Sequence, residues 1–402
     1  MPDISFSGLL IVAVVAFLAP LVLSLTPARR LPTSALEIVV GIVLGPSVLG
    51  WVKVDLPLAI LSVFGLAFLL FLSGLEVDLE RLRGRLLVFV GSGFLLSFGL
   101  ALLVGYGLFV ARQVVSPLLI AIILVATSLG IVVPVLEDAG ESDSAFGQLV
   151  IAGAMFAEFG SIILLSLFFS REASSITTKL VLFAGFVLLA ASFAFVALRL
   201  TRSRRIAAVL LQLQDTTAQI RVRGAFLLLV AFVALASLLG LETILGAFVA
   251  GVILRFVAGD QMPTHPQFRQ KLEAVGFGVF VPVFFVTSGI QFDLAALISS
   301  PSTLLRAPIF LVAWLLVRGL PAFLYRPLVG TRRAIVAGLL QATSLTFIVA
   351  ATQIGTELGL ITKATGAALI AAGLLSVLIF PLLALTILRR AQPVSPAAHE
   401  QT

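Results

Sequence analysis

The sequence predicts an all-α polytopic membrane protein with about 13 transmembrane helices. Of its 402 residues, 60% are hydrophobic and only 11% are charged, whereas a soluble domain carries about 25% charged residues. The hydrophobic residues form long segments, separated by charged or Pro/Gly-rich breaks, and most segments are long enough to cross a bilayer as a helix. This composition excludes nucleic-acid binding as an explanation of the net charge of +7.

The first segment begins just after Asp3 and lacks the basic start of a signal peptide, so we interpret it as a spanning helix. The segments 34–50 and 223–239 are short for a crossing, and the connection at 239–242 is very tight. The predicted helices cover residues 5–25, 34–50, 57–76, 86–111, 116–136, 145–169, 177–200, 223–239, 241–257, 276–292, 302–326, 332–353 and 363–388.

The basic residues alternate between loops as a multi-pass protein requires. With the N-terminus outside, 19 of the 26 Lys and Arg residues fall in inside loops, six fall outside, and Arg318 lies within a span. Because basic residues gather on the cytoplasmic side, this bias predicts a plasma-membrane protein with its N-terminus outside and its C-terminus in the cytoplasm. Residues 201–223 are expected to be a cytoplasmic linker, one form of which is an amphipathic helix on anionic lipid. Residues 391–402 are expected to be a disordered tail.

Glu158 is the only charged residue between Asp143 and Arg171. About 13 apolar residues on each side give roughly 20 Å of helix each way, which places Glu158 near the middle of the bilayer. An ionisable group at that depth is costly, so it is a functional candidate by default, and small neighbours such as Gly153 and Ala157 let other helices approach it. The alternative is a structural buried acid with a fixed partner.

Three sequence words recur in the same order. The shift between partner helices is seven, an odd number, so the second copy runs through the membrane in the opposite direction, as in many secondary transporters. We therefore predict two inverted six-helix repeats, 1–170 and 223–390, joined by a linker helix and loop, 171–222; the alternative is that the halves share only a generic membrane composition. The matches are Ala126–Leu129 with Ala342–Leu345, Ser73–Leu79 with Ser288–Leu294, and Leu36, Glu37, Gly41 and Gly45 with Leu241, Glu242, Gly246 and Gly251.

The first of these words lies in two spans that we expect to be discontinuous. Pro134 removes a backbone donor just after Thr127 and Ser128, which disturbs the preceding turn. Broken helices that meet at the midplane offer their dipole ends to an ion. The alternative is that the hydroxyls bond back to their own helices. The candidate ion- or proton-binding residues are Glu158, Thr127, Ser128 and Ser161, and the polar residues of the second crossed helix are Gln341, Thr343, Ser344 and Thr346.

Arg318 is the other charge within a span. It is expected either to extend to the inner interface or to pair with Glu158 when the acid carries no ion. There is no cysteine, and the two histidines, His265 and His399, lie in a loop and in the tail, so a resident metal site and a cofactor are not expected. No nucleophile–base set is apparent, so the chain is not expected to be an enzyme.

Four motifs carry a resemblance to a known family, and they lie at Glu37–Pro46, Phe68–Leu79, Thr127–Leu136 and Pro282–Leu294. Together they resemble the membrane domain of bacterial monovalent cation:proton antiporters, closest to the Kef-type and sodium/proton exchanger branch. The resemblance implies 13 helices, a homodimer, and elevator-type exchange by a core with crossed helices. It also implies that Glu158 is the ion-binding acid and Arg318 the basic core residue. The motifs are EIVVGIVLGP at Glu37–Pro46, FLLFLSGLEVDL at Phe68–Leu79, TSLGIVVPVL at Thr127–Leu136 and PVFFVTSGIQFDL at Pro282–Leu294.

The sixth helix departs from that family. The family usually has two polar residues side by side there, whereas this chain has Ala157-Glu158 and no asparagine anywhere. With one carboxylate, the expected function is electroneutral exchange of Na⁺ or K⁺ for H⁺ at Glu158. The alternatives are transport of another solute, such as an organic anion, or a sensor or binding module that does not transport.

Overall fold

A computed structural model describes the fold over residues 6–25, 32–77, 85–169, 176–201, 219–258 and 266–389. Every regular element in these ranges is helical. Ten helical stretches among them are long and apolar enough to cross a membrane, and two shorter apolar helices accompany them. A multi-pass all-α membrane protein is therefore confirmed. Most of the predicted linker, 202–218, and the predicted tail lie outside the described residues.

The chain divides into two compact units. Unit 1 comprises Met1–Glu80 and Phe159–Ile298, and unit 2 comprises Arg81–Glu158 and Ser299–Thr402. The long helix α7 (Ala145–Phe168) passes from unit 2 into unit 1 immediately after Glu158.

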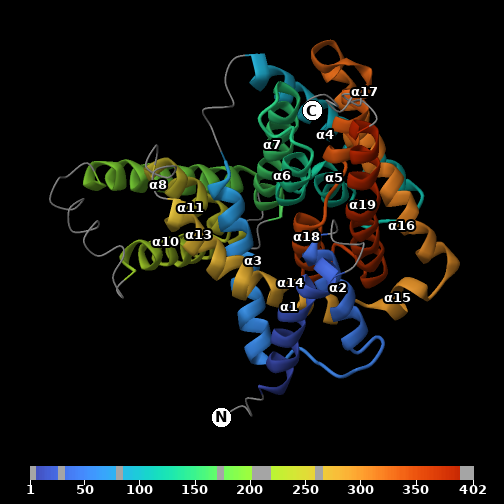
Figure 1. Ribbon diagram of the computed structural model, residues 1–402, viewed down its shortest axis with the longest axis horizontal. Coiled ribbons are helices and arrows are strands. Elements are labelled where there is room, and N and C mark those ends of the chain that lie inside the picture. Colours follow the sequence, from blue (N-terminus) through green and yellow to red (C-terminus); the bar gives the residue numbers. More distant parts are fainter. Residues whose placement is uncertain are drawn as a thin grey trace, which may run out of the picture. The chain divides into compact units, whose positions relative to one another are not determined.

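Unit 1 is built from the N-terminal helices and the middle of the chain (Figure 1). Its elements are α1 (Ser7–Leu25), α2 (Thr33–Leu44), α3 (Leu56–Leu75), α8 (Ile176–Thr201), α10 (Ile220–Leu238), α11 (Thr243–Ala258), α13 (Pro266–Val275), the π-helical η1 (Gly276–Phe280), α14 (Val281–Ile290) and α15 (Leu294–Ile298).

Two helix pairs of unit 1 make the same close contact through glycine. Helix α2 packs along α14, and α11 packs along α3. In each pair, a Cβ atom added to one glycine would meet the Cα of the facing glycine and the carbonyl oxygen three residues before it. The facing glycines are Gly41 with Gly289, and Gly251 with Gly74. Small residues let helix backbones approach closely where lipid offers no hydrophobic driving force. The two contacts are therefore equivalent in geometry.

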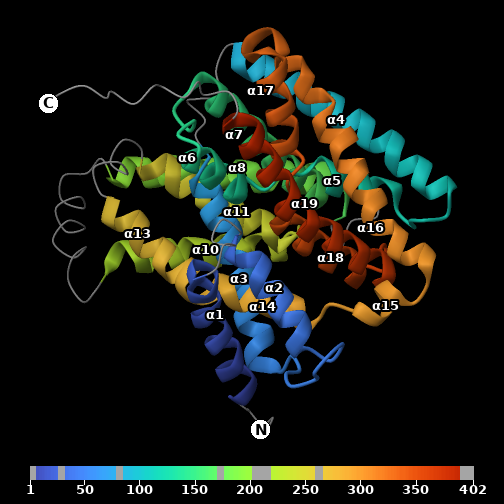
Figure 2. The same ribbon diagram turned by 45° about the vertical axis from the view of Figure 1, so that its right-hand side comes forward.

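Unit 2 holds the remaining helices, and Figure 2 shows α16, α17 and α19 from the side. Its elements are α4 (Arg85–Val110), α5 (Pro117–Val125), α6 (Leu129–Asp138), the first part of α7, α16 (Pro301–Trp314), the π-helical η2 (Leu315–Gly319), the 3₁₀-helical η3 (Pro321–Tyr325), α17 (Arg326–Gln341), α18 (Thr346–Glu357) and α19 (Lys363–Arg389).

Two spans of unit 2 are interrupted. The first break, Ala126–Ser128, separates α5 from α6, and the second break, Ala342–Leu345, separates α17 from α18. The repeated word Ala-Thr-Ser-Leu therefore falls at both breaks, and the predicted discontinuous helices are confirmed. The breaks lie against each other, because Ser128 N–H donates to the Thr343 carbonyl oxygen at 3.0 Å.

Proline is not the cause of the first break, contrary to the expectation from the sequence. Pro134 lies inside α6, and the carbonyl that its missing N–H would leave without a helical partner belongs to Gly130. That carbonyl lies after α6 has already begun at Leu129. At this break a main-chain N–H group finds its acceptor on a side chain from another element, as described below.

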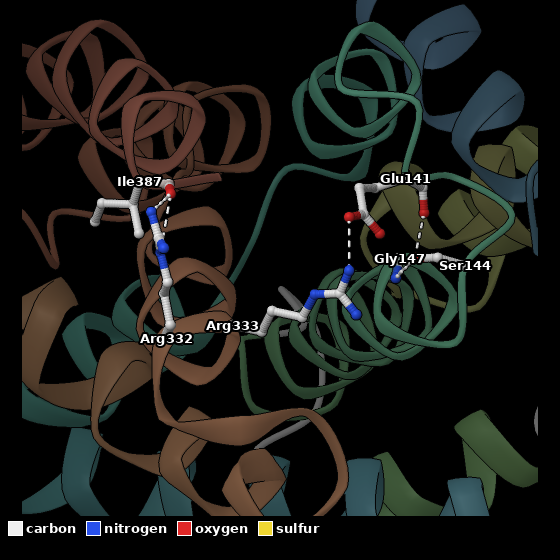
Figure 3. Close-up of polar contacts among 6 residues, drawn as sticks. All are labelled: Glu141, Ser144, Gly147, Arg332, Arg333 and Ile387. Carbon is white, nitrogen blue, oxygen red and sulfur yellow. Dashed lines mark hydrogen bonds and ion pairs between the residues drawn. The ribbon is translucent and has the colours of Figure 1, made fainter. Parts of the chain in front are cut away.

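Two arginines tie helix α17 to other elements of unit 2 (Figure 3). The helix bends at Gly330, whose φ of +80° favours glycine. Just after the bend, the Nη2 of Arg332 donates to the Ile387 carbonyl oxygen of α19 at 2.6 Å. The next residue, Arg333, pairs with Glu141 in the α6–α7 connection at 2.8 Å. Helix α17 is thus tied to α19 and to the α6–α7 connection.

Candidate functional site

Glu158 lies on α7 and is buried, with 3% of its surface exposed. Its Oε2 accepts a hydrogen bond of 2.9 Å from the backbone N–H of Leu129. Leu129 is the first residue of α6, and the first N–H groups of a helix have no partner within it. The helix dipole also favours a negative charge at that end. The carboxylate therefore caps the helix that follows the first break.

Hydroxyl groups cap the second break. The Oγ of Ser128 accepts the N–H groups of Leu345 and Thr346 at 2.9 and 3.2 Å. It also shares a hydrogen bond of 3.0 Å with the Oγ1 of Thr346. On the other side, Ser376 of α19 accepts the N–H of Ser344 at 3.2 Å. The serine of the first break thus satisfies the start of α18.

Arg318 lies in η2 and is 2% exposed. Its guanidinium donates to three neutral oxygens: the Oγ1 of Thr127 at 3.0 Å, the Oγ of Ser97 at 3.2 Å and the carbonyl of Gly153 at 3.3 Å. These oxygens come from the first break, from α4 and from α7, so one cation joins three elements of unit 2. The pairing with Glu158 that the sequence suggested stays a prediction.

The hydroxyl of Thr127 both donates and accepts a hydrogen bond. Besides accepting from Arg318, its Oγ1 donates to the carbonyl of Gln341 at 2.6 Å. A group that already faces a guanidinium is a poor place for a second cation, because like charges repel. This hydroxyl therefore joins the end of α17 to Arg318, and the ion-binding role predicted for it stays a prediction.

The other predicted polar residues divide into partnered and unpartnered groups. Gln341 donates to the hydroxyl of Tyr325 at 3.4 Å. Thr343 bonds back to the carbonyl four residues earlier, which is the alternative we considered for these hydroxyls. The hydroxyls of Ser344 and Ser161 are buried and have no hydrogen-bond partner among the described residues.

Sequence reasoning missed several groups that contact Arg318, Glu158 or the second break. Ser97 and Ser376 are serines with apolar neighbours in long apolar helices, and both are fully buried. Their isolation within an apolar segment is a signal that could have identified them. The N–H of Leu129 and the carbonyl of Gly153 are main-chain groups, for which the side-chain sequence carries no signal.

Comparison with known proteins identifies the family. Residues 13–389 match the family model described as "Sodium/hydrogen exchanger, transmembrane". The chain belongs to this family. The protein named "Putative Na(+)/H(+) antiporter YjbQ" of Bacillus subtilis (strain 168) is 30% identical over 400 residues, which are 95% of this chain and 63% of that protein. The chain therefore spans less than two thirds of that relative.

A second exchanger relative matches over almost its whole length. The protein named "Probable Na(+)/H(+) antiporter 3" of Methanocaldococcus jannaschii is 27% identical over 386 residues, which are 92% of this chain and 94% of that protein. The solved structure of the sodium proton antiporter MjNhaP1 from Methanocaldococcus jannaschii has a TM-score of 0.65, with 17% identity and coverage of 95% of this chain and 98% of that one. The exchanger fold thus extends over nearly the whole chain, and its family is one of transporters rather than enzymes.

Proposed function

We propose that the chain is a secondary active antiporter that exchanges a monovalent cation, Na⁺ or K⁺, for protons, with Glu158 as the site that both ions share. One observation carries this proposal: a buried carboxylate caps the first break, where the two interrupted helices of unit 2 meet. A bare carboxylate within hydrocarbon is costly unless a proton or a cation neutralises it. The two ions therefore compete for the same oxygens.

Glu158 supplies the oxygen atoms that a proton or a cation needs. A carboxylate offers two oxygens with about four lone-pair sites, and the N–H of Leu129 occupies one of them at Oε2. The same N–H holds the carboxylate in place without neutralising it. In this proposal a proton and a dehydrated monovalent cation bind in turn to the carboxylate oxygens.

The neighbouring residues set the expected stoichiometry. Ala157 supplies no second acidic or amide ligand, and the charge of Arg318 stays in the protein throughout the cycle. The site then carries the same net charge with one proton bound as with one monovalent cation bound. We therefore propose one-for-one, electroneutral exchange.

We propose an elevator-type cycle in which unit 2 is the moving part. Glu158, Arg318 and both breaks all belong to unit 2. Unit 1 is tied together by the close glycine contacts between α2 and α14 and between α3 and α11, which suits an element that stays in place. In this proposal the protein works as a homodimer in the plasma membrane.

Thirteen crossings in two inverted repeats, with the N-terminus outside and the C-terminus inside, remain our proposed topology. The ten long stretches and two shorter helices give thirteen if Pro301–Glu357, with 57 residues, counts as two crossings, since about 20 residues span a bilayer. The glycine contacts support the repeat. Exchanging the second helix for the ninth and the third for the tenth turns the α2–α14 contact into the α11–α3 contact.

Exchange in proteoliposomes tests the proposal. Vesicles with a trapped pH-sensitive dye receive pulses of Na⁺ or K⁺, with and without a clamped membrane potential. We expect cation-dependent proton flux that does not respond to the potential, and we expect Glu158→Gln to abolish it because the amide cannot exchange a proton for a cation. The control is Glu141→Gln, which removes a carboxylate of the same unit that is paired with Arg333 instead.

Two outcomes would contradict the proposal. Normal exchange by Glu158→Gln would remove Glu158 from the ion site. Uptake of an organic anion without any cation–proton exchange would instead support the alternative of a transporter for another solute.

A further inference from the structure

The hydroxyl of Ser128 has all of its hydrogen-bonding capacity in use. A serine hydroxyl has one proton to donate and two lone pairs. The N–H groups of Leu345 and Thr346 take the two lone pairs, and the hydroxyl proton is left to donate to the Oγ1 of Thr346. Ser128 is also fully buried. Its side chain therefore has no lone pair left for a bound cation.

The main chain of the same residue connects the second break to the acid. The N–H of Ser128 donates to the Thr343 carbonyl oxygen at 3.0 Å. The next N–H along the chain, that of Leu129, donates to the Oε2 of Glu158 at 2.9 Å. The start of α18, Ser128, Leu129 and the Glu158 carboxylate thus form one continuous chain of contacts.

We propose that Ser128 is a positioning residue: it fixes the first break against the start of α18 and thereby sets where the Leu129 N–H presents the Glu158 carboxylate to the cation. This inference rests on the proposed antiport at Glu158 and assigns Ser128 a role other than that of an ion ligand. Removing its hydroxyl takes the Ser128 acceptor from the buried N–H of Leu345 and the part-buried N–H of Thr346. Losing that acceptor is costly and forces the break to rearrange. The carboxylate moves with it.

The main test compares three variants in the proteoliposome assay at one fixed pH. Ser128→Ala is expected to raise the apparent KM for Na⁺ about tenfold, which corresponds to the loss of about one buried hydrogen bond. Ser128→Thr keeps a hydroxyl and is expected to stay within about twofold of the wild type. The matched control is Ser376→Ala, which removes the other serine cap of the second break without touching the link to Glu158. It is expected to leave the KM unchanged even if it lowers the thermal stability in detergent.

Thr346→Val separates positioning from ligation and also serves if Ser128→Ala does not fold. It removes the hydroxyl that accepts the proton of Ser128. A positioning role predicts that Thr346→Val alone raises the KM, by about threefold, and that adding it to Ser128→Ala has little further effect, since coupled residues are not additive. A ligand role predicts a wild-type KM for Thr346→Val.

The inference is overturned if Ser128→Ala keeps the wild-type KM, if Ser376→Ala raises the KM equally, or if Thr346→Val has no effect. Failure of the proposed function looks different: the wild-type chain then shows no cation–proton exchange, or Glu158→Gln exchanges normally. The positioning role alone would be rejected if the wild-type chain exchanges, Glu158→Gln is inactive and Ser128→Ala keeps the wild-type KM.

Discussion

The two breaks of unit 2 share the sequence Ala-Thr-Ser-Leu but are satisfied by different chemistry. At the first break the N–H of Leu129 bonds to a carboxylate from α7. At the second break the hydroxyl of Ser128 accepts the N–H groups of Leu345 and Thr346. The hydroxyl of Ser376 from α19 accepts the N–H of Ser344. The helices α7 and α19 are the sixth and thirteenth predicted spans, so Glu158 and Ser376 lie on corresponding helices. The carboxylate of Glu158 can change its charge, whereas the hydroxyl of Ser376 cannot.

This difference places the chemistry outside the repeated word. Both breaks expose helix N-terminal N–H groups that need an acceptor. Among the acceptors described at the two breaks, Glu158 is a carboxylate, which binds protons and cations. The serine hydroxyls stay neutral. A protein with two similar breaks therefore has one candidate ion site, because only one neighbouring helix supplies an acid.

Unit 1 shows the opposite behaviour. The α2–α14 and α3–α11 contacts have the same geometry, with each glycine facing a glycine and a carbonyl three residues before it. The corresponding elements thus stay alike where they only pack, and differ where they meet the candidate ion site. The following predictions test this contrast.

The largest effect is expected at Arg318, the cation that contacts the first break. Arg318→Leu removes the donor to Thr127, Ser97 and the Gly153 carbonyl. Because these buried oxygens lose charged hydrogen bonds, we expect the maximal exchange rate in proteoliposomes to fall about 100-fold, the equivalent of roughly 3 kcal/mol.

Arg306→Leu is the matched control for that experiment. It also removes an arginine whose side chain bonds neutral groups of unit 2, Gln113 and Thr365, but these lie outside both breaks. An equal loss of exchange in the two variants would show that exchange depends on any arginine contact of unit 2. The contact of Arg318 with the first break would then have no particular role in exchange.

The sequence identified polar residues that the structure buries, but it did not predict the contacts they make. Glu158, Arg318 and both Ala-Thr-Ser-Leu words stood out because charges and repeated polar words are rare in apolar spans. It could not show that the hydroxyls of Thr127 and Ser128 are already engaged, since their partners lie 191 to 218 positions away. It also led us to connect the first break with Pro134, because helix caps from other helices leave no local pattern.

The next effect concerns the paired glycines of unit 1. Gly41→Ala and Gly251→Ala each place a methyl group against the backbone of a facing helix. We expect both to lower the stability by about 1–3 kcal/mol, as overpacking does, and to do so by similar amounts because the contacts are equivalent. Thermal unfolding in detergent measures this.

Gly224→Ala is the control for the paired glycines. It lies in α10 of the same unit, and an added Cβ there meets no atom within 4 Å. It is expected to be neutral or to stabilise by up to about 1 kcal/mol through helix propensity. A large loss for Gly41→Ala with none for Gly251→Ala would contradict the equivalence of the two contacts and weaken the proposed inverted repeat.

The smallest effect is expected for the ion pair between Arg333 and Glu141. Unlike Arg318, Arg333 is exposed, with 47% of its side-chain surface accessible, and its partner is 16% accessible. Water screens such a pair, so a double-mutant cycle of Arg333→Gln and Glu141→Gln should give a coupling energy of about 0.2–1 kcal/mol in thermal unfolding. Exchange rates of both variants should remain near the wild-type rate, because this pair ties α17 to the α6–α7 connection and contacts neither break. A loss of exchange as large as that of Arg318→Leu would mean that the anchoring of α17, rather than the buried cation at the first break, limits transport.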